Sequence, residues 1–383
     1  MANKTSLRVE IFSRLTDIGQ EAWDACAGPN NPFVSYAFLS AIEDSGSVGE
    51  GTGWYPRHLV VRGAGGEVES VAPCYAKIHS YGEYVFDQAW ANAFEQAGGR
   101  YYPKLQVSVP FSPVPGPRLL TRGPEIAPLA GSLEAIVEEH AWSSAHVTFC
   151  TESEWNRLGE AGWLQRLGLQ FHWENHNYLN FENFLEALSS RKRKAIRRER
   201  RAAQAGLTFR VLSGAEITPT VWKRFYEFYL STVERKWGGA YLTPEFFPLL
   251  GQRLGECVVL MLAERHGRAI AGALNLLGDE VLYGRNWGCI EDVPFLHFEL
   301  CYYQAIEYAI THGLKRVEAG AQGEHKIQRG YLPQPTYSAH YIAHPGLRRA
   351  VAGFLDGERH SVREAIASLA QEGPYKTEGG RGS

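Results

Sequence analysis

The stretch from Leu282 to Pro333 decides the fold: LYGRNWG (282–288), PFLHFELCYYQAIEYAITHG (294–313) and LKRVEAGAQGEHKIQRGYLP (314–333). The first piece predicts a buried strand, the second an amphipathic helix, and the third another buried strand that runs into a polar loop. Reactive side chains in α/β proteins gather where loops leave the carboxyl ends of central strands, so this loop is a candidate site. Its polar residues are Gln322, Glu324, His325, Lys326 and Arg329.

One side chain of the predicted helix breaks its apolar pattern. At 3.6 residues per turn, the apolar face comprises Phe295, Phe298, Tyr302, Ile306 and Ala309. Glu299 falls at the edge of this face, where a carboxylate is costly unless it is paired, protonated or catalytic. Two interpretations remain open, a base that takes a proton from a substrate and a structural ion pair with Arg285 or Arg329.

The length and composition of the chain predict a soluble protein with two domains. With 383 residues, of which 44% are hydrophobic, the chain is too long for one ordinary core. It has no apolar run long enough to span a membrane, and residues 1–10 lack a signal-peptide core, so we expect a cytoplasmic protein. The six cysteines are scattered without a CxxC pair, which indicates reduced thiols rather than a zinc site or disulfides.

Both halves of the chain alternate between predicted strands and helices. In the first half, LRVEIF (7–12) and HVTFC (146–150) have the β-branched and aromatic content of strands. In the second half, CVVLMLAERHG (257–267) and RAIAGALNLLG (268–278) predict an antiparallel pair with a turn at Gly267.

These patterns predict an α/β (α+β) fold in which each half holds a mixed central sheet flanked by helices. The predicted limits are 1–178 for the N-terminal domain and 179–352 for the C-terminal domain. Residues 353–383 are expected to form a helical extension and a disordered tail.

A concentrated basic helix stands out against the net charge of −3. The segment RKRKAIRRERR (191–201) holds eight basic residues and Glu199, a local charge of +7, so the rest of the chain sums to −10. Cations at a helix N-terminus oppose the helix dipole, and a bound phosphate would make them favourable. A solvated cationic face and a DNA-reading helix are the alternatives, but no dimer signal supports DNA. The candidate phosphate ligands are Lys192, Arg193, Lys194, Arg197 and Arg198.

Several familiar catalytic motifs are absent from the sequence, among them GxSxG, GxxxxGK[ST], HExxH and GxGxxG after a strand. What remains suits transfer of a group from a phosphate-bearing carrier to an amine, which needs a base and donors for an oxyanion. Glu299 and His325 are the candidate bases, and Lys326 and Arg329 the candidate donors. Pairs such as His297 and Glu299 do not share a helix face, so we expect no metal.

The chain resembles the bacterial FemAB-like, GNAT-type N-acyltransferases, often labelled peptidoglycan biosynthesis or recognition proteins. The resemblance spans nearly the whole chain. It rests on Leu282–Pro333 and on GTGWYPRHL (51–59), FDQAWANAFEQAGGRYYPKLQVSVPFSPVPGPRLL (86–120), LSSRKRKAIRRERR (188–201) and RKWGGAYLTPEFF (235–247). It implies two tandem GNAT-like domains, as in Fem-type aminoacyl-tRNA-dependent transferases. EAGAQG (318–323) and KIQRGYL (326–332) match Fem-type elements near the substrate, with Glu318 where that pattern has Asp.

The resemblance implies an N-acyltransferase that takes an aminoacyl group from aminoacyl-tRNA and binds no cofactor. The acceptor would be an amino group of a cell-wall precursor, a peptide or a small metabolite, and a lipid-linked precursor would bring the protein transiently to a membrane. An acyl-CoA donor is the first alternative, and a non-catalytic module that recognises a glycan or nucleic acid is the second. The predicted substrate-binding residues are Asp87, Trp90, Tyr102, Lys104 and Arg118 in the first domain and Arg285, Asn286, Trp287, Gln322 and Glu324 in the second.

Overall fold

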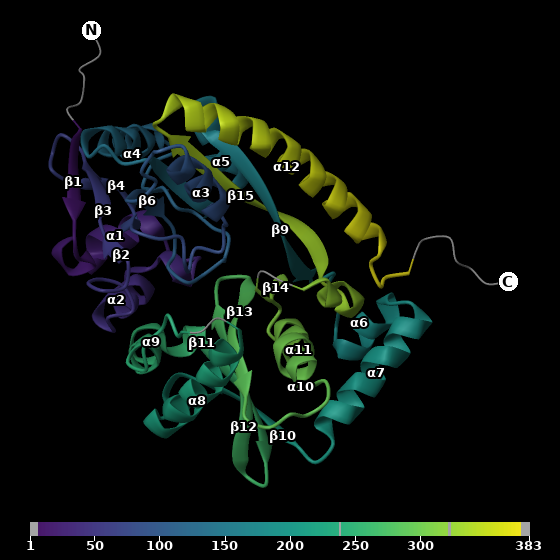
Figure 1. Cartoon of the computed structure of the whole chain (residues 1–383). Coiled ribbons are helices and arrows are strands. Elements are labelled where there is room, and N and C mark those ends of the chain that lie inside the picture. Colours follow the sequence, from purple (N-terminus) through teal and green to yellow (C-terminus); the bar gives the residue numbers. More distant parts are fainter. Residues whose placement is uncertain (1–6, 237–238, 321–322, 377–383) are drawn as a thin grey trace. The chain divides into compact units, whose positions relative to one another are not determined.

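The computed structural model describes residues 7–236, 239–320 and 323–376 (Figure 1). The chain forms two compact units, each built from separate stretches of sequence. Unit 1 comprises Met1–Gly168 and Pro335–Arg363, and unit 2 comprises Leu169–Gln334 and Glu364–Ser383. The two units are therefore discontinuous in sequence, whereas the predicted domains were the continuous ranges 1–178, 179–352 and 353–383.

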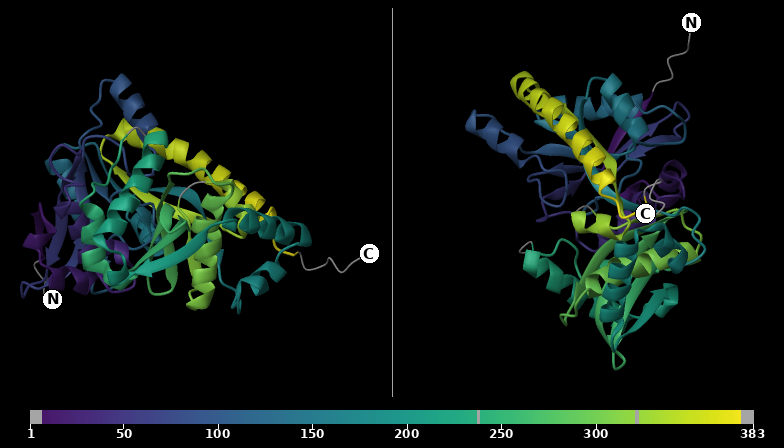
Figure 2. Two further views of the ribbon diagram at one scale, coloured as in Figure 1. Left: turned by 90° about the horizontal axis from the view of Figure 1, so that it is seen from below. Right: turned by 90° about the vertical axis from the view of Figure 1, so that its right-hand side faces the viewer.

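Three elements have residues in both units. They are strand β9 (Leu164–Glu174), strand β15 (Leu332–Ile342) and helix α12 (Pro345–Gln371). Helix α12, drawn in yellow, is one uninterrupted helix in every view (Figures 1 and 2). The helix begins at Pro345, directly after β15, and therefore starts earlier than the helical extension predicted from residue 353.

Unit 1 contains an antiparallel four-stranded sheet of order β1-β3-β4-β7 and a mixed sheet whose order in this unit is β2-β5-β6-β8-β15. Only β6 and β8 pair in parallel among the described strands of unit 1. The strands are β1 (Arg8–Phe12), β2 (Trp54–Pro56), β3 (His58–Arg62), β4 (Val68–Ala72), β5 (Cys74–Lys77), β6 (Lys104–Val107), β7 (Leu120–Thr121) and β8 (Ser144–Cys150). The helices are α1 (Gln20–Ala27), α2 (Tyr36–Asp44), α3 (Gln88–Gln96), α4 (Ala127–Glu139) and α5 (Glu152–Glu160), with short 3-10 helices at Leu15–Asp17 and Pro32–Val34.

Unit 2 is a sheet of order β10-β11-β12-β13-β14-β9, in which only β13 and β14 pair in parallel among the described strands. The strands are β10 (Thr208–Ser213), β11 (Val258–Arg265), β12 (Arg268–Leu277), β13 (Val281–Cys289) and β14 (Arg316–Glu318). The helices are α6 (Phe181–Ala187), α7 (Ser190–Gln204), α8 (Pro219–Lys236), α9 (Phe246–Leu254), α10 (Leu296–Phe298) and α11 (Gln304–Thr311), with 3-10 helices at Gly214–Glu216, Gly255–Cys257 and Glu324–Arg329.

Helices α8 and α11 pack on opposite faces of the sheet in unit 2 (Figure 1). Ile270 and Leu282 join the apolar cluster that includes Ile306 of α11. On the other face, Gly272 and Gly288 lie against α8, where a Cβ at either position would meet Phe225 or Phe228. The predicted β11–β12 hairpin is confirmed, with Arg265 opposite Arg268 across the turn.

The predicted helix of residues 294–313 is interrupted by a π-helical turn at Glu299–Tyr303. This wider turn changes which side chains face the core. Tyr302, Ile306 and Ala309 are buried as predicted, but Phe295 is 38% exposed, so the predicted apolar face is wrong at its start.

Candidate functional site

A pocket opens in unit 2 where the parallel strands β13 and β14 part. The two strands are paired only from Val281 opposite Arg316 to Tyr283 opposite Glu318. Beyond Tyr283, β13 continues without β14 beside it. The pocket has a volume of about 90 Å³ and is open to solvent. Its lining includes Asn275, Arg285, Asn286, Trp287, His297, Cys301, Tyr302 and Ala319. The structure therefore brings together three of the predicted substrate-binding residues with His297 of the π-containing helix.

Strand β13 bulges at the pocket. Leu274 of β12 pairs with Asn286 and Asn275 with Gly284, so Arg285 is the extra residue of β13. A bulge leaves a residue out of the ladder and redirects its backbone and side chain. Bulges of this kind recur beside active sites, and this one places polar backbone groups at the pocket wall.

His325 stands at the edge of this pocket, bonded to one of its lining residues. Its Nε2 lies 2.9 Å from the hydroxyl of Tyr302. Its ring also contacts Phe298 and His297, with centroid distances of 5.5 and 6.1 Å. His325 is exposed, whereas burial raises the pKa of Tyr302, so the tyrosine stays a neutral hydroxyl that can donate or accept. The pair can pass a proton between the pocket and solvent.

Lys326 and Arg329 belong to the same 3-10 helix but point to protein groups. Lys326 is 1% exposed, its Nζ donates to the Gly320 carbonyl at 2.8 Å, and burial lowers its pKa to about 7. The Arg329 guanidinium lies 3.4 Å from the ring centroid of Phe298 and bonds both carboxylate oxygens of Glu199 at 3.0 Å. Arg329 thus ties the polar loop to α7.

Glu299 is fully buried in an ion pair with the basic helix. Arg200 approaches its carboxylate with Nη2 at 3.0 Å and Nε at 3.1 Å, and the amides of Gln204 and Gln304 donate at 2.9 and 2.8 Å. The ion-pair interpretation therefore acquires a partner, Arg200, that differs from the two named from the sequence. With these donors around it, Glu299 holds α7 to the π-helical turn, and its role as a base stays a prediction.

Helix α7 has one side that binds the protein and one that faces solvent. On the first, Arg200 pairs with Glu299 and Lys192 bonds Gln328. Arg197 is exposed and pairs with Glu182. Four further exposed cations share one face at spacings of three and four residues, and within the described chain their side chains have no hydrogen bond or ion pair. We call these the cationic stripe: Arg191, Lys194, Arg198 and Arg201.

The predicted phosphate ligands therefore divide. Lys194 and Arg198 lie in the cationic stripe, and Arg193 is half-buried beside it. Lys192 and Arg197 are held by protein partners. The first turn of α7 contains no acidic residue, so nothing in it offsets the repulsion between its cations and the positive end of the helix dipole.

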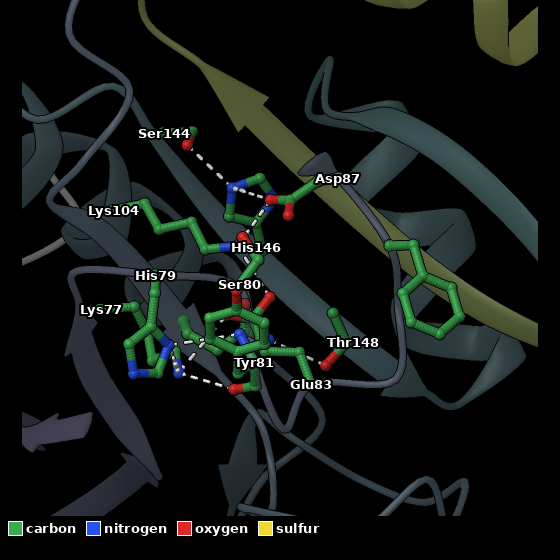
Figure 3. A network of polar contacts seen from close by, with 12 residues as sticks. Lys77, His79, Ser80, Tyr81, Glu83, Asp87, Lys104, Ser144, His146 and Thr148 are labelled. Atoms are coloured by element: carbon green, nitrogen blue, oxygen red, sulfur yellow. Dashed lines mark hydrogen bonds and ion pairs between the residues drawn. The ribbon is translucent and has the colours of Figure 1, made fainter. Parts of the chain in front are cut away.

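In unit 1, the predicted residues Asp87, Tyr102 and Lys104 meet in one polar cluster, and Figure 3 shows Asp87 and Lys104. The Lys104 ammonium group, fully buried, donates to Asp87 at 2.5 Å, to Glu83 at 2.7 Å and to Ser80 at 2.9 Å. The Tyr102 hydroxyl lies 2.8 Å from the same Ser80 hydroxyl. These contacts join the 78–87 loop to β6.

The other two predicted residues of unit 1 lie apart from these lysine contacts. Trp90 packs edge-on against His340 with ring centroids 5.0 Å apart. Arg118 is fully buried and donates to backbone carbonyls, including those of Thr148 at 3.0 Å and Val114 at 2.5 Å. Its guanidinium therefore fixes the proline-rich loop. A groove shared between the two groups of predicted residues stays a prediction.

Two predicted residues of the polar loop remain. Gln322 lies outside the described residues, and Glu324 is exposed at the start of its 3-10 helix. Across the described ranges, no group of three or more His, Cys, Asp or Glu side chains has a metal-binding arrangement. None of the helices in the same ranges has both the length and the apolar character needed to cross a bilayer.

A sequence profile of the FemAB-like family, described as peptidoglycan biosynthesis/recognition, matches residues 14–377. The chain belongs to the FemAB-like family. Membership supports a transferase of acyl or aminoacyl groups. No curated protein is similar enough in sequence to match.

Solved structures share the fold of this FemAB-like protein at low sequence identity. FemX is 14% identical with a TM-score of 0.54, over 90% of this chain and 100% of its own. The C-terminal domain of a putative lysylphosphatidylglycerol synthetase from Agrobacterium fabrum is 10% identical with a TM-score of 0.52, over 88% and 95%. L-PGS from Bacillus licheniformis is 10% identical with a TM-score of 0.52, over 85% and 98%. The predicted α/β fold, with a mixed sheet flanked by helices in each of two units, is confirmed, and FemX shares this fold.

Sequence reasoning missed most of the charged cluster in this FemAB-like chain. Lys77, Glu83, His146 and His340 are each at most 3% exposed and lie beside Lys104 or one another. Their signal is a strand in which every second residue is polar although both faces are buried, as in KLQVS (104–108). Alternation of this kind is normally read as one solvated face, which is why the cluster escaped notice.

Proposed function

We propose that this FemAB-like protein is an N-acyltransferase that moves an aminoacyl group from aminoacyl-tRNA to an amine. The observation that carries the proposal is the cationic stripe of α7. Its four exposed cations, spaced along one face, match a phosphodiester backbone better than a single small anion. The same unit holds the pocket beside β13, so donor binding and chemistry have places in one domain.

The proposed reaction needs no covalent enzyme intermediate. The acceptor nitrogen attacks the ester carbonyl carbon, a C–N bond forms, and the ester C–O bond to the tRNA ribose breaks. His325, through Tyr302, takes the proton that the amine loses, and the ribose oxygen that leaves takes up a proton. Polar groups of the β13 bulge at Arg285 and Asn286 are the proposed donors to the oxyanion.

The family description and one structural neighbour support this choice of chemistry. The family is described by peptidoglycan biosynthesis/recognition, which suits an amino group of a cell-wall precursor as acceptor. The A. fabrum neighbour is named for lysylphosphatidylglycerol, an aminoacylated lipid. A peptide or a small metabolite with a free amine is the remaining acceptor class, and the reaction would take place in the cytoplasm, where charged tRNA is found.

The test is a binding titration against aminoacyl-tRNA and uncharged tRNA at several salt concentrations, for the natural protein and two paired variants. Lys194→Ala with Arg198→Ala removes two stripe cations, whereas Lys223→Ala with Arg268→Ala removes two exposed cations of unit 2 elsewhere. We expect the first pair to weaken binding about 10-fold at low salt and to reduce the salt slope by about 1–2. The control pair should leave both nearly unchanged. Equal effects from the two pairs would show that the stripe is only a solvated face.

An acyl-CoA donor is the second candidate, and the bulge at Arg285 favours it. Strand β13 bulges at the pocket and parts there from β14, and backbone N–H groups in such an irregular strand can bind the phosphates of a nucleotide-linked acyl group. Saturable binding of acetyl-CoA, without tRNA binding, would move the donor to this class. Binding of neither donor would favour a module that recognises a glycan or nucleic acid.

A further inference from the structure

The mixed sheet of unit 1 buries a polar face. Along β6, the side chains of Lys104, Gln106 and the following Ser108 share one face, while Leu105 and Val107 join the apolar core on the other. Register continues the polar row across the sheet, because Gln106 lies opposite His146 of β8, and His146 opposite His340 of β15. A sheet face that served packing alone would be apolar.

Polar atoms without a partner concentrate on this face. Within residues 7–236, 239–320 and 323–376, the buried oxygens Glu83 Oε1, Asp87 Oδ1 and Gln106 Oε1 accept no hydrogen bond, and the Ser108 hydroxyl and His340 Nε2 are likewise unbonded. The Lys77 ammonium nitrogen lies 3.7 Å from Glu83 Oε1, which is beyond hydrogen-bonding distance. Natural proteins satisfy almost all buried polar groups, so unsatisfied acceptors gathered on one face indicate a ligand that supplies donors.

The charges of the cluster favour a cation. Burial raises the pKa of Glu83 to about 7 and lowers that of Lys77 to about 6. Burial also opposes the charged form of Lys104, but Glu83 and Asp87 outweigh it and raise its pKa, and burial lowers the pKa of His146 to about 3. Slightly above neutral pH, both carboxylates are therefore charged and only one of the two lysines is.

We propose that this polar face is a binding site for the primary ammonium group of a small ligand. An ammonium group has three N–H donors and no acceptor. The three unbonded oxygens of Glu83, Asp87 and Gln106 are the matching acceptors. Glu83 and Asp87 already converge, because both bond the same Lys104 nitrogen at 2.7 and 2.5 Å (Figure 3).

The 78–87 loop covers the site and has the amphipathic character of a lid. Its inward side chains, Glu83 and Asp87, are at most 3% exposed, whereas Ile78, Tyr81 and Phe86 are 49%, 63% and 55% exposed. The loop is held to the sheet by polar contacts that a ligand can replace, since Lys104 and Lys77 supply them. The site belongs to unit 1 and the proposed donor site to unit 2, so either proposal can fail alone.

The test compares two amines that differ only in their N–H groups. Ethanolamine carries a primary ammonium group, and choline has the same charge and hydroxyl with three methyl groups in place of the N–H donors. We expect ethanolamine at about ten times its Kd to raise the Tm by about 3 °C at slightly alkaline pH and constant ionic strength. Choline at the same concentration should leave the Tm unchanged.

Two variants connect the response to the site. Glu83→Gln should abolish the ethanolamine shift, whereas Glu43→Gln should keep it, because Glu43 is a buried carboxylate of the same unit that bonds His58 at 2.6 Å. If Glu83→Gln does not fold, Gln106→Met removes the third acceptor without a charge change and should also abolish the shift. Equal shifts from both amines, no shift from ethanolamine, or a shift that survives in the foldable variants would overturn the proposal.

Discussion

At the scale of single residues, the pairing of Glu299 with Arg200 decides how the carboxylate is interpreted. Removing one partner of a buried pair leaves a desolvated charge, whereas removing both does not. We therefore expect Glu299→Ala to lower the free energy of unfolding by about 3–5 kcal/mol, and a double variant with Arg200→Met to recover much of this loss. Urea unfolding of the two single variants and the double variant measures the coupling. A Glu299→Ala protein of normal stability that lacks transferase activity would instead favour the role of a base.

The sequence singled out Glu299 but could not name its partner. A helical wheel compares residues within one helix, and Arg200 lies in α7, about a hundred positions earlier. The π-helical turn at Glu299–Tyr303 also changes the facing of the helix, which a fixed period of 3.6 cannot anticipate. The helical wheel therefore identified Glu299 correctly as an unusual carboxylate, but its partner Arg200 could be found only from the tertiary structure.

At the scale of elements, the approach of α8 to β13 depends on one glycine. A Cβ at Gly288 would lie 1.8 Å from the Phe228 carbonyl oxygen, a backbone atom that moves only with the helix. We expect Gly288→Ala to lower the free energy of unfolding by about 3 kcal/mol, since overpacking forces backbone shifts. Gly272→Ala on the neighbouring strand is the control, because its Cβ would meet only side-chain atoms at 3.0 Å or more. Thermal unfolding that ranks the two variants equally would contradict this account.

Local elements were more predictable than their pairing. The β11–β12 hairpin followed from two apolar runs and a turn at Gly267, where φ is +74°. By contrast, β14 pairs with β9 through Arg316 opposite Glu174, a contact between distant parts of the sequence. Periodicity identifies a strand and its faces, but the order of strands in a sheet depends on contacts that leave no local pattern.

At the scale of the whole molecule, the same limit applies to the division into units. Residues 335–363 return to the unit formed by the first 168 residues, so neither unit is one continuous stretch. The chain passes from one unit to the other within β9 and within β15. Because each is a single continuous strand, the sequence shows no linker at these two boundaries. The basic character of α7 was foreseeable from charge alone, but of the four residues in the cationic stripe only Lys194 and Arg198 were predicted as phosphate ligands. The polar face of unit 1 became visible only when the register of its strands was known.

Buried lysines in both units predict how the stability of the molecule depends on pH. Burial lowers the pKa of Lys77 to about 6 and that of Lys326 to about 7, whereas lysines in the unfolded chain stay protonated to about pH 10.4. Above pH 7 the unfolded state therefore binds more protons than the folded state, and the free energy of unfolding rises with pH by up to about 1.4 kcal/mol per pH unit for each lysine. This stability is lost as the pH falls from about 10.4 to the two folded pKa values.

Glu83 and Glu318 act in the opposite direction. Burial raises the pKa of each to about 7, so their contribution to stability falls as the pH rises through that value. The slope due to the lysines should consequently approach its full value near pH 8, above the titration of both carboxyls. Urea unfolding between about pH 7 and pH 8 measures it, and Lys326→Met should lower the slope by about 1 kcal/mol per pH unit. A variant slope equal to that of the natural protein would mean that Lys326 stays protonated in the fold.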